Sequence, residues 1–121
     1  ILIGLVGSEM CIRDSHTTFR TFASSIERGG KLIYFDGDPV VKQLAQEVRE
    51  DITAMPYDQH VVVEKEGKTY LQTRYGDFPV YIPDRFFLIN LNAARLACRQ
   101  LGVKDADFYQ ALSEYSVSLQ P

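Results

Sequence analysis

Apolar residues recur along the first half of the chain at helical spacing, then in a continuous run. An i, i+3, i+4, i+7 pattern predicts an amphipathic helix over His16–Arg28, ended by Gly29-Gly30. The run Lys31–Phe35 is apolar almost throughout, as expected of a strand covered on both faces. The helical pattern is formed by Phe19, Phe22, Ala23 and Ile26.

A second helix and strand follow this run. Asp38 is a good N-cap and Pro39 a good first helical residue, which predicts a helix to about Glu50. Ile52–Met55 is a short second strand, and strand, helix and strand together predict a parallel βαβ unit with a right-handed crossover. The Asp-Gly-Asp-Pro turn is compatible with a metal or phosphate site, but a turn with a helix cap is the favoured interpretation. The helix stripe is formed by Val41, Leu44, Ala45 and Val48.

Between Tyr57 and Ile82 the pattern changes to loose alternation interrupted by turn signals. Glu66-Gly67 and Gly76-Asp77 are the turns, so the segment predicts a three-strand antiparallel meander. Its last strand has Phe78, Val80 and Ile82 on one face. His60 opens the first strand beside no obvious partner, and we expect it at the surface.

The segment from Phe78 to Gly102 continues through a turn at Pro83-Asp84 into a helix. Asn90 falls in the first turn of this helix, where backbone N–H groups are unpaired and the helix dipole is positive. A polar side chain at such a place contacts a nucleotide in some proteins and belongs to a capped helix in more of them. The spacing predicts an apolar stripe of Leu91, Ala94, Cys98 and Leu101. It also predicts a solvated face with Asn92, Arg95 and Arg99.

A last helix is predicted to begin at Lys104-Asp105, before an end, Ser116–Pro121, that has no pattern and is expected to be unstructured. The fold class is therefore α/β with a mixed sheet. In it, a parallel βαβ unit leads to an antiparallel three-strand meander and two C-terminal helices. The stripe of the last helix is formed by Phe108, Ala111, Leu112 and Tyr115.

Composition and charge bound the function. The chain has 121 residues, of which 45% are hydrophobic and 24% charged, as in one globular domain. A net charge of −3 argues against nucleic-acid and anionic-membrane partners, and no apolar run approaches the ~20 residues that span a bilayer. Cys11 and Cys98 form neither a disulfide framework nor a metal cluster, and Cys98 is expected to be a small buried hydrophobe.

The first fifteen residues, Ile1–Ser15, differ in character from the rest. They begin without Met, and no basic region precedes the apolar head, so they fail as a signal peptide. The segment GLVGSEMCIRDS resembles translated sequencing-adapter read-through, which occurs at the ends of reading frames from assembled environmental DNA. We therefore expect this tail to contribute nothing to the core.

Three motifs in the second half stand out: Asn90-Leu91-Asn92-Ala93-Ala94-Arg95, Leu101-Gly102 and Phe108-Tyr109-Gln110-Ala111-Leu112. In this order they resemble the end of the central ATP-binding domain of the Mur ligases, which build the peptide stem of bacterial peptidoglycan. Among these enzymes, the UDP-N-acetylmuramate–alanine ligase and the ligase that reattaches recycled tripeptide are the most similar. The resemblance covers about Thr17 to Tyr115, so the domain segment is 16–115.

The resemblance is imperfect at the turn before the helix. The family pattern is Gly-x-His-Asn-x-x-Asn, and its His and asparagines lie against the adenine of ATP. Here Asp84, Phe86 and Phe87 stand in place of the Gly, His and first Asn, and only the second Asn survives, as Asn90. Phenylalanines can stack on a base but cannot form those hydrogen bonds. Asn90 is thus the one site residue carried over, as an adenine-side contact.

For the whole enzyme, the resemblance implies ATP- and Mg²⁺-dependent amide formation in the cytoplasm. ATP phosphorylates the carboxylate of a UDP-N-acetylmuramate-type substrate, and an amino acid or peptide amine attacks the acyl phosphate. A phosphate-binding loop, magnesium ligands and the amino-acid domain are not found in these 121 residues. We therefore name no catalytic and no metal-binding residue, and expect no tight nucleotide binding and no activity from this piece. The alternative is a small non-catalytic α/β domain whose likeness is architectural.

Overall fold

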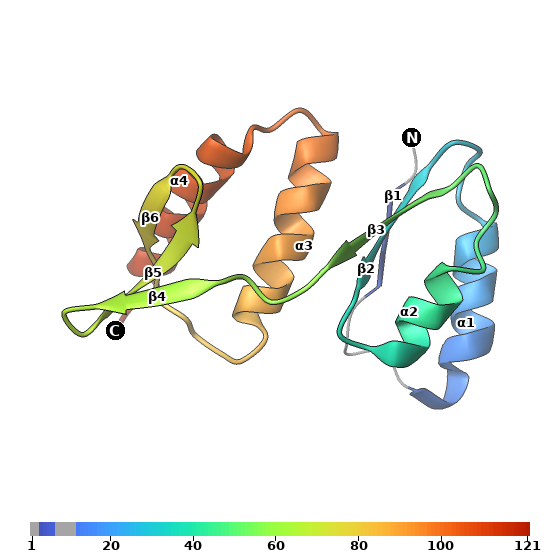
Figure 1. The fold of residues 1–121 in the computed structure, drawn as a ribbon, viewed down its shortest axis with the longest axis horizontal. Coiled ribbons are helices and arrows are strands. Elements are labelled where there is room, and N and C mark those ends of the chain that lie inside the picture. Colours follow the sequence, from blue (N-terminus) through green and yellow to red (C-terminus); the bar gives the residue numbers. More distant parts are fainter. Residues whose placement is uncertain (1–2, 7–11) are drawn as a thin grey trace. The chain divides into compact units, whose positions relative to one another are not determined.

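The computed structural model describes residues 3–6 and 12–121, with side chains described from residue 18 onward. The chain forms two compact units, one ending at Asp58 and the other running from Gln59 to Pro121. The first unit carries a parallel sheet and the second an antiparallel one (Figure 1). The predicted α/β class, with a parallel βαβ unit before a three-strand meander and two helices, is confirmed. Hydrogen bonding groups the described strands into two sheets, where the sequence pattern predicted one.

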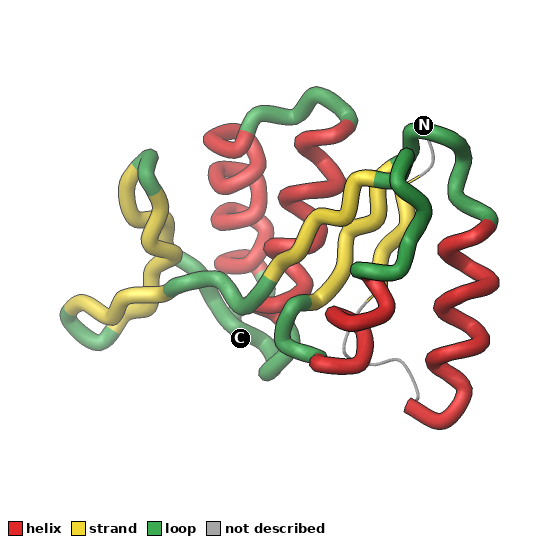
Figure 2. The backbone as a smooth tube through the Cα atoms, turned by 45° about the vertical axis from the view of Figure 1, so that its right-hand side comes forward, coloured by secondary structure: helices red, strands yellow, loops and turns green. Residues whose placement is uncertain are grey.

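The first unit is built on three parallel strands in the order β1-β2-β3, which lie side by side in Figure 2. The middle strand β2 pairs in register with β3 from Lys31 opposite Thr53 to Phe35 opposite Tyr57. Two helices, α1 and α2, connect the strands, as parallel pairing requires. The bounds are β1 Ile3–Val6, α1 Ile12–Ser24, β2 Lys31–Phe35, α2 Pro39–Ala45 and β3 Thr53–Tyr57.

Both helices of this unit pack on one face of β2. Leu32 and Tyr34 belong to the core on that face, while Ile33 is buried on the opposite face. The predicted strand covered on both faces is therefore confirmed. The helix predicted to about Glu50 ends at Ala45, so Val48, like Ile26 after α1, belongs to an expected stripe but lies outside the helices. Every buried member of this core is apolar. The members are Phe19, Ala23, Ile26, Leu32, Tyr34, Val41, Leu44, Ala45 and Ile52.

The tail expected to lie outside the fold supplies part of it. β1 pairs with β2 in parallel, from Ile3 opposite Lys31 to Val6 opposite Tyr34. The helix predicted over His16–Arg28 begins earlier, at Ile12, and ends at Ser24. Its end follows from two serines, because the hydroxyl groups of Ser24 and Ser25 donate to carbonyls three residues back and compete with the helical ladder. The remaining residues of the tail lie outside the described ones.

The second unit contains the meander and two helices. Its first turn is a two-residue hairpin at Glu66-Gly67, where both residues have positive φ, 52° and 77°. The second turn is at Arg74-Tyr75, not at Gly76-Asp77 as predicted. The hydroxyl of Thr73 accepts from the Tyr75 N–H and donates to the carbonyl of Gly76. The bounds are β4 Val62–Lys65, β5 Lys68–Thr73, β6 Gly76–Pro79, α3 Phe87–Gln100 and α4 Asp105–Ser118.

A core of Leu71, Val80, Leu88, Leu91 and Tyr109 joins this sheet to both helices. The predicted stripe of α3 is wrong beyond Leu91. Ala94 is exposed, Cys98 is half-buried and Leu101 is 78% exposed, while Leu88, Ala93 and Leu96 are buried. Apolar residues lie on several sides of this helix, so their spacing alone did not single out the packed one.

The buried face of α4 is also displaced from the predicted stripe. Ala111 and Tyr115 are exposed, and Tyr109, Ser113 and Ser116 are buried instead. The serines serve backbone groups next to β6. Ser113 Oγ donates to the carbonyl of Pro79 at 2.5 Å, and Ser116 Oγ accepts from the Tyr81 N–H at 3.2 Å. The end expected to be unstructured is therefore helical as far as Ser118.

Candidate functional site

The turn that leads into α3 is organised by Asp84. Its carboxylate accepts from the Phe86 N–H at 2.9 Å, and its carbonyl accepts from the Phe87 N–H at 3.3 Å. An aspartate that satisfies the unpaired N–H groups of a helix start is a common device. The acid that replaces the glycine of the resembling pattern thus stabilises the turn.

The two phenylalanines of this turn have different surroundings. Phe87 packs against the core of the second unit. Phe86 is half-buried, with the guanidinium carbon of Arg85 4.7 Å from its ring centroid, within cation–π distance. Neither side chain offers a hydrogen-bonding group to a ligand, and Phe87 is occupied by packing.

Asn90 lies where the sequence placed it. It is in the first turn of α3, its N–H donates to the carbonyl of Phe86 at 2.9 Å, and its side chain is exposed. No described residue forms a hydrogen bond with the amide of its side chain. The amide therefore has both a donor and an acceptor open to a ligand.

A second polar cluster links the segment before β4 to α3 and α4 and was not predicted. His60, expected at the surface, is 8% exposed, and its Nε2 lies 2.7 Å from the Tyr109 hydroxyl. Burial is the main cause that lowers the pKa of His60. Burial also raises the pKa of Tyr109. The spacing of residues in the sequence could not indicate this contact, because His60 and Tyr109 lie 49 positions apart.

The face of α3 expected to be solvated is largely occupied by an ion-pair network. Asp105, 13% exposed, binds Arg95 at 3.0 Å and also pairs with Arg99. The hydrogen bond from Arg99 is the largest cause that lowers the pKa of Asp105. Arg95 is only 17% exposed and also donates to Asn92, at 3.3 Å. The network fixes α4 to α3 through Asp105.

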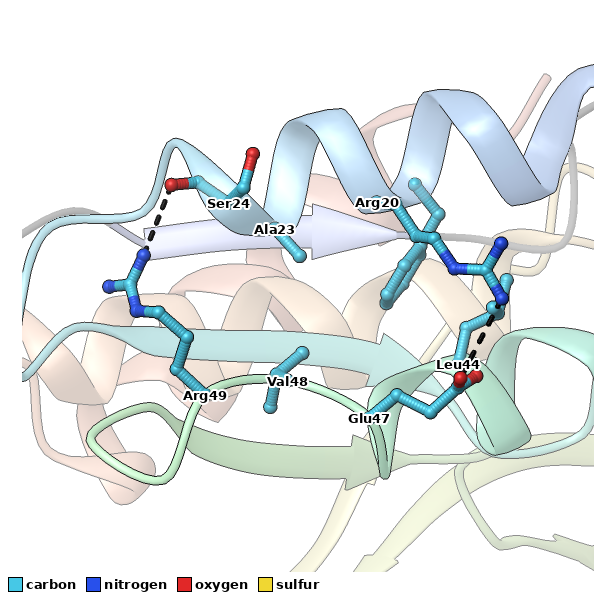
Figure 3. A pocket seen from close by; sticks show the side chains of 8 residues that line it. Arg20, Ala23, Ser24, Leu44, Glu47, Val48 and Arg49 are labelled. Atoms are coloured by element: carbon cyan, nitrogen blue, oxygen red, sulfur yellow. Dashed lines mark hydrogen bonds and ion pairs between the residues drawn. The ribbon is translucent and has the colours of Figure 1, made fainter.

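A cavity of about 260 Å³ lies in the first unit, between α1 and the segment after α2 (Figure 3). Its apolar lining includes Phe19, which is buried in the core, and Val48. Arg20 at its rim pairs with Glu47 at 3.6 Å, and Arg49 donates to the carbonyl of Ser24 at 3.0 Å. The charged groups that line this cavity are thus engaged by the chain itself.

Arg49 also closes the end of α1. Its guanidinium donates to the carbonyl of Ile26 at 2.6 Å and to Asp51, whose carboxylate in turn accepts from the Gly29 N–H. These hydrogen bonds, that of Arg49 first, lower the pKa of Asp51 to about 2. Arg49 and Asp51 therefore hold the backbone at the end of α1 in place.

In the Asp-Gly-Asp-Pro turn, Asp38 has the favoured capping role. Asp38 Oδ1 accepts from the N–H groups of Val40 and Val41, at 2.9 and 3.3 Å. Asp36 faces Lys42 at 3.7 Å. Within the described residues there is no group of three or more His, Cys, Asp or Glu side chains that could hold a metal ion. No helix in that part of the chain is long and apolar enough to cross a membrane.

With this geometry in view, comparison with known proteins identifies no relative. No protein family, no curated protein and no solved structure matches the chain.

Proposed function

We propose that this chain is part of the central ATP-binding domain of a Mur ligase. Such an enzyme uses ATP and Mg²⁺ to join an amino acid or peptide to a UDP-N-acetylmuramate-type carboxylate, in the cytoplasm. Support comes from the order of elements, in which a βαβ unit precedes a meander, a turn and two helices. The motifs that resemble the family lie on corresponding elements, with Asn90–Arg95 inside α3 and Phe108–Leu112 inside α4.

The observation that carries the proposal is the exposed amide of Asn90 in the first turn of α3. The resemblance gives this residue an adenine-side contact, and an amide that is not engaged by the chain is available for one. An asparagine can donate and accept at the same time, as the edge of adenine requires. A helix cap would instead have brought this side chain back to its own backbone.

The altered turn is a reason to expect that the chain by itself binds nucleotide only weakly. Phe86 and Phe87 cannot replace the hydrogen bonds of a His and an Asn, and Phe87 is committed to the core. No Gly-rich phosphate loop with a following Lys occurs in the 121 residues. The chemistry therefore belongs to residues of a whole enzyme, and we assign no catalytic residue to this piece.

A chimera tests the proposal. Residues 16–115 replace the corresponding segment of a full-length muramyl ligase, and ATP affinity is measured by calorimetric titration. We expect Phe86→His with Phe87→Asn to raise the affinity, because each unmatched polar edge of a buried base costs about 1–3 kcal/mol, or roughly 5- to 150-fold. Adding Asn90→Ala should lower the affinity again.

The matched control is Gln110→Ala, an exposed amide on α4 that pairs with Glu114. It should leave ATP affinity unchanged in the repaired chimera. Equal affinities before repair, after repair and after Asn90→Ala would show that the turn does not face the nucleotide. The chain would then be a non-catalytic α/β domain with an architectural likeness only.

A further inference from the structure

His60 is the second residue of the second unit, at the point where the chain enters it. Three hydrogen bonds hold it there. Its backbone N–H donates to the carbonyl of Leu88 at 3.1 Å, its ring Nδ1 lies 2.8 Å from the carbonyl of Val61, and its Nε2 lies 2.7 Å from the Tyr109 hydroxyl. The entry segment is thereby fixed to α3 by the backbone and to α4 by the ring.

The partners define the protonation state of the ring. A carbonyl only accepts, so Nδ1 must carry the proton that is shared with Val61. Nε2 of a neutral ring then accepts, and the hydroxyl of Tyr109 donates to it. Neutral His60 is therefore fully satisfied in its 8% exposed site.

The surroundings of this pair disfavour a charged ring. Tyr109 is enclosed by aromatic contacts with Tyr75, Phe78 and Phe108, and its ring meets that of His60 edge-on at 5.4 Å. The charged groups that act on the pair are the cations Arg95 and Arg99 of α3 and the carboxylate of Asp105 on α4, and the titratable phenol of Tyr75 also acts on Tyr109. That carboxylate is already engaged by both arginines. Burial and the nearby cation Arg95 both oppose an imidazolium at position 60.

We propose that His60 is a pH-sensitive latch that fixes the entrance of the second unit to α4 when neutral and weakens this attachment when protonated. A proton on Nε2 changes it from acceptor to donor and removes the acceptor of the Tyr109 O–H. The hydroxyl would have to rotate within its aromatic enclosure, and the new charge would lie near Arg95. Mild acid thus loosens the attachment of the entry segment to α4 within the second unit.

The direction of the pH effect follows from the shift of the His60 pKa below its ordinary value of 6.5, caused first by burial and then by Arg95. Between the pKa of His60 in the folded chain and its pKa in the unfolded chain, the unfolded chain binds more protons. The contribution of His60 to the free energy of unfolding is therefore fully present above about pH 6.5 and is lost as the pH falls toward the folded-state pKa. Over that range the unfolding equilibrium constant rises by up to about tenfold per pH unit.

The test is a titration of the whole chain. The ring protons of His60 and His16, the two histidines of the sequence, are followed by NMR between pH 4.5 and 8. Urea denaturation is measured over the same range for the wild type, His60→Gln and the control His16→Gln. We expect His60 to titrate below 6.5 and the histidine-range pH dependence to persist in His16→Gln. It should disappear in His60→Gln.

Tyr109→Phe separates the latch from simple packing. It keeps the ring contacts but removes the hydroxyl that favours neutral His60, so the His60 titration should move upward toward 6.5 and the acid loss should shrink. A His60 that titrates at or above 6.5 in the wild type would overturn the proposal. So would a pH dependence that follows His16, or a His60 titration that Tyr109→Phe leaves unmoved.

Discussion

The two units differ in what they bury. In the first unit, every buried side chain among the described residues is apolar. In the second, His60, Ser113 and Ser116 are buried alongside the apolar core. The first unit is a regular parallel sheet under two helices, and its polar residues act at the ends of elements. The second uses polar side chains inside, where its short meander leaves backbone groups to be satisfied.

The difference separates two ways of specifying a packed unit. An apolar core tolerates any arrangement that excludes water, and its strength follows the area that it buries. A buried hydroxyl or imidazole is stable only opposite its own partner, so it penalises other registers of a helix against a sheet. Ser113 and Ser116 therefore fix which face of α4 meets β6, a choice that the apolar residues of α4 leave open.

The largest expected effect tests the apolar unit. Phe19 is 1% exposed at the centre of the first core, and Phe19→Ala should lower the free energy of unfolding by about 3–5 kcal/mol through lost transfer energy and a cavity. The control is Phe22→Ala, a half-buried phenylalanine of the same helix, which should cost clearly less. Urea denaturation measures both. Equal losses in the free energy of unfolding would mean that the degree of burial does not determine how much each residue of this core contributes to stability.

A smaller effect tests the polar interior. Ser116 is fully buried, and Ser116→Ala leaves the Tyr81 N–H without its acceptor, which should cost about 1–3 kcal/mol. Ser118→Ala is the matched control, because Ser118 is exposed and donates only to the carbonyl of Tyr115 one turn back. Its effect should stay within about 0.5 kcal/mol. If both serines cost the same in urea denaturation, the hydroxyl of Ser116 does not fix α4.

The same contrast explains how far the sequence predicted the structure. Helical spacing found the core faces of both helices in the first unit, because apolar residues there lie on one side only. On α4 the same rule selected Ala111 and Tyr115, which are exposed, and passed over the serines. A serine in a pattern counts as polar until the backbone group that it serves is known, and that group lies 34 or 35 residues away.

The candidate site shows a similar limit. The position of Asn90 in the first turn of α3 was predicted correctly, because a helix start depends on nearby residues, while its contact with a ligand stays a prediction. The burial of His60 and the pairing of Arg95 were not foreseen, because each depends on α4 folding back onto earlier elements. The strand Ile3–Val6 was missed for a different reason: composition suggested that the tail lies outside the fold, whereas pairing with β2 requires only a backbone in register.

The smallest expected effect concerns a polar group at the edge of the apolar unit. Asp38 caps α2 through the N–H groups of Val40 and Val41, and Asp38→Ala should cost about 1 kcal/mol in urea denaturation. Asp38→Asn keeps an oxygen acceptor at the same place and should be nearly neutral. Asp36→Ala removes an exposed 3.7 Å pair with Lys42 and should cost well under 1 kcal/mol. Since Asp38 serves one short helix while Ser116 lies inside a packed interface, the loss from Asp38→Ala should be the lesser. The reverse order would remove the distinction between polar groups at element ends and polar groups inside.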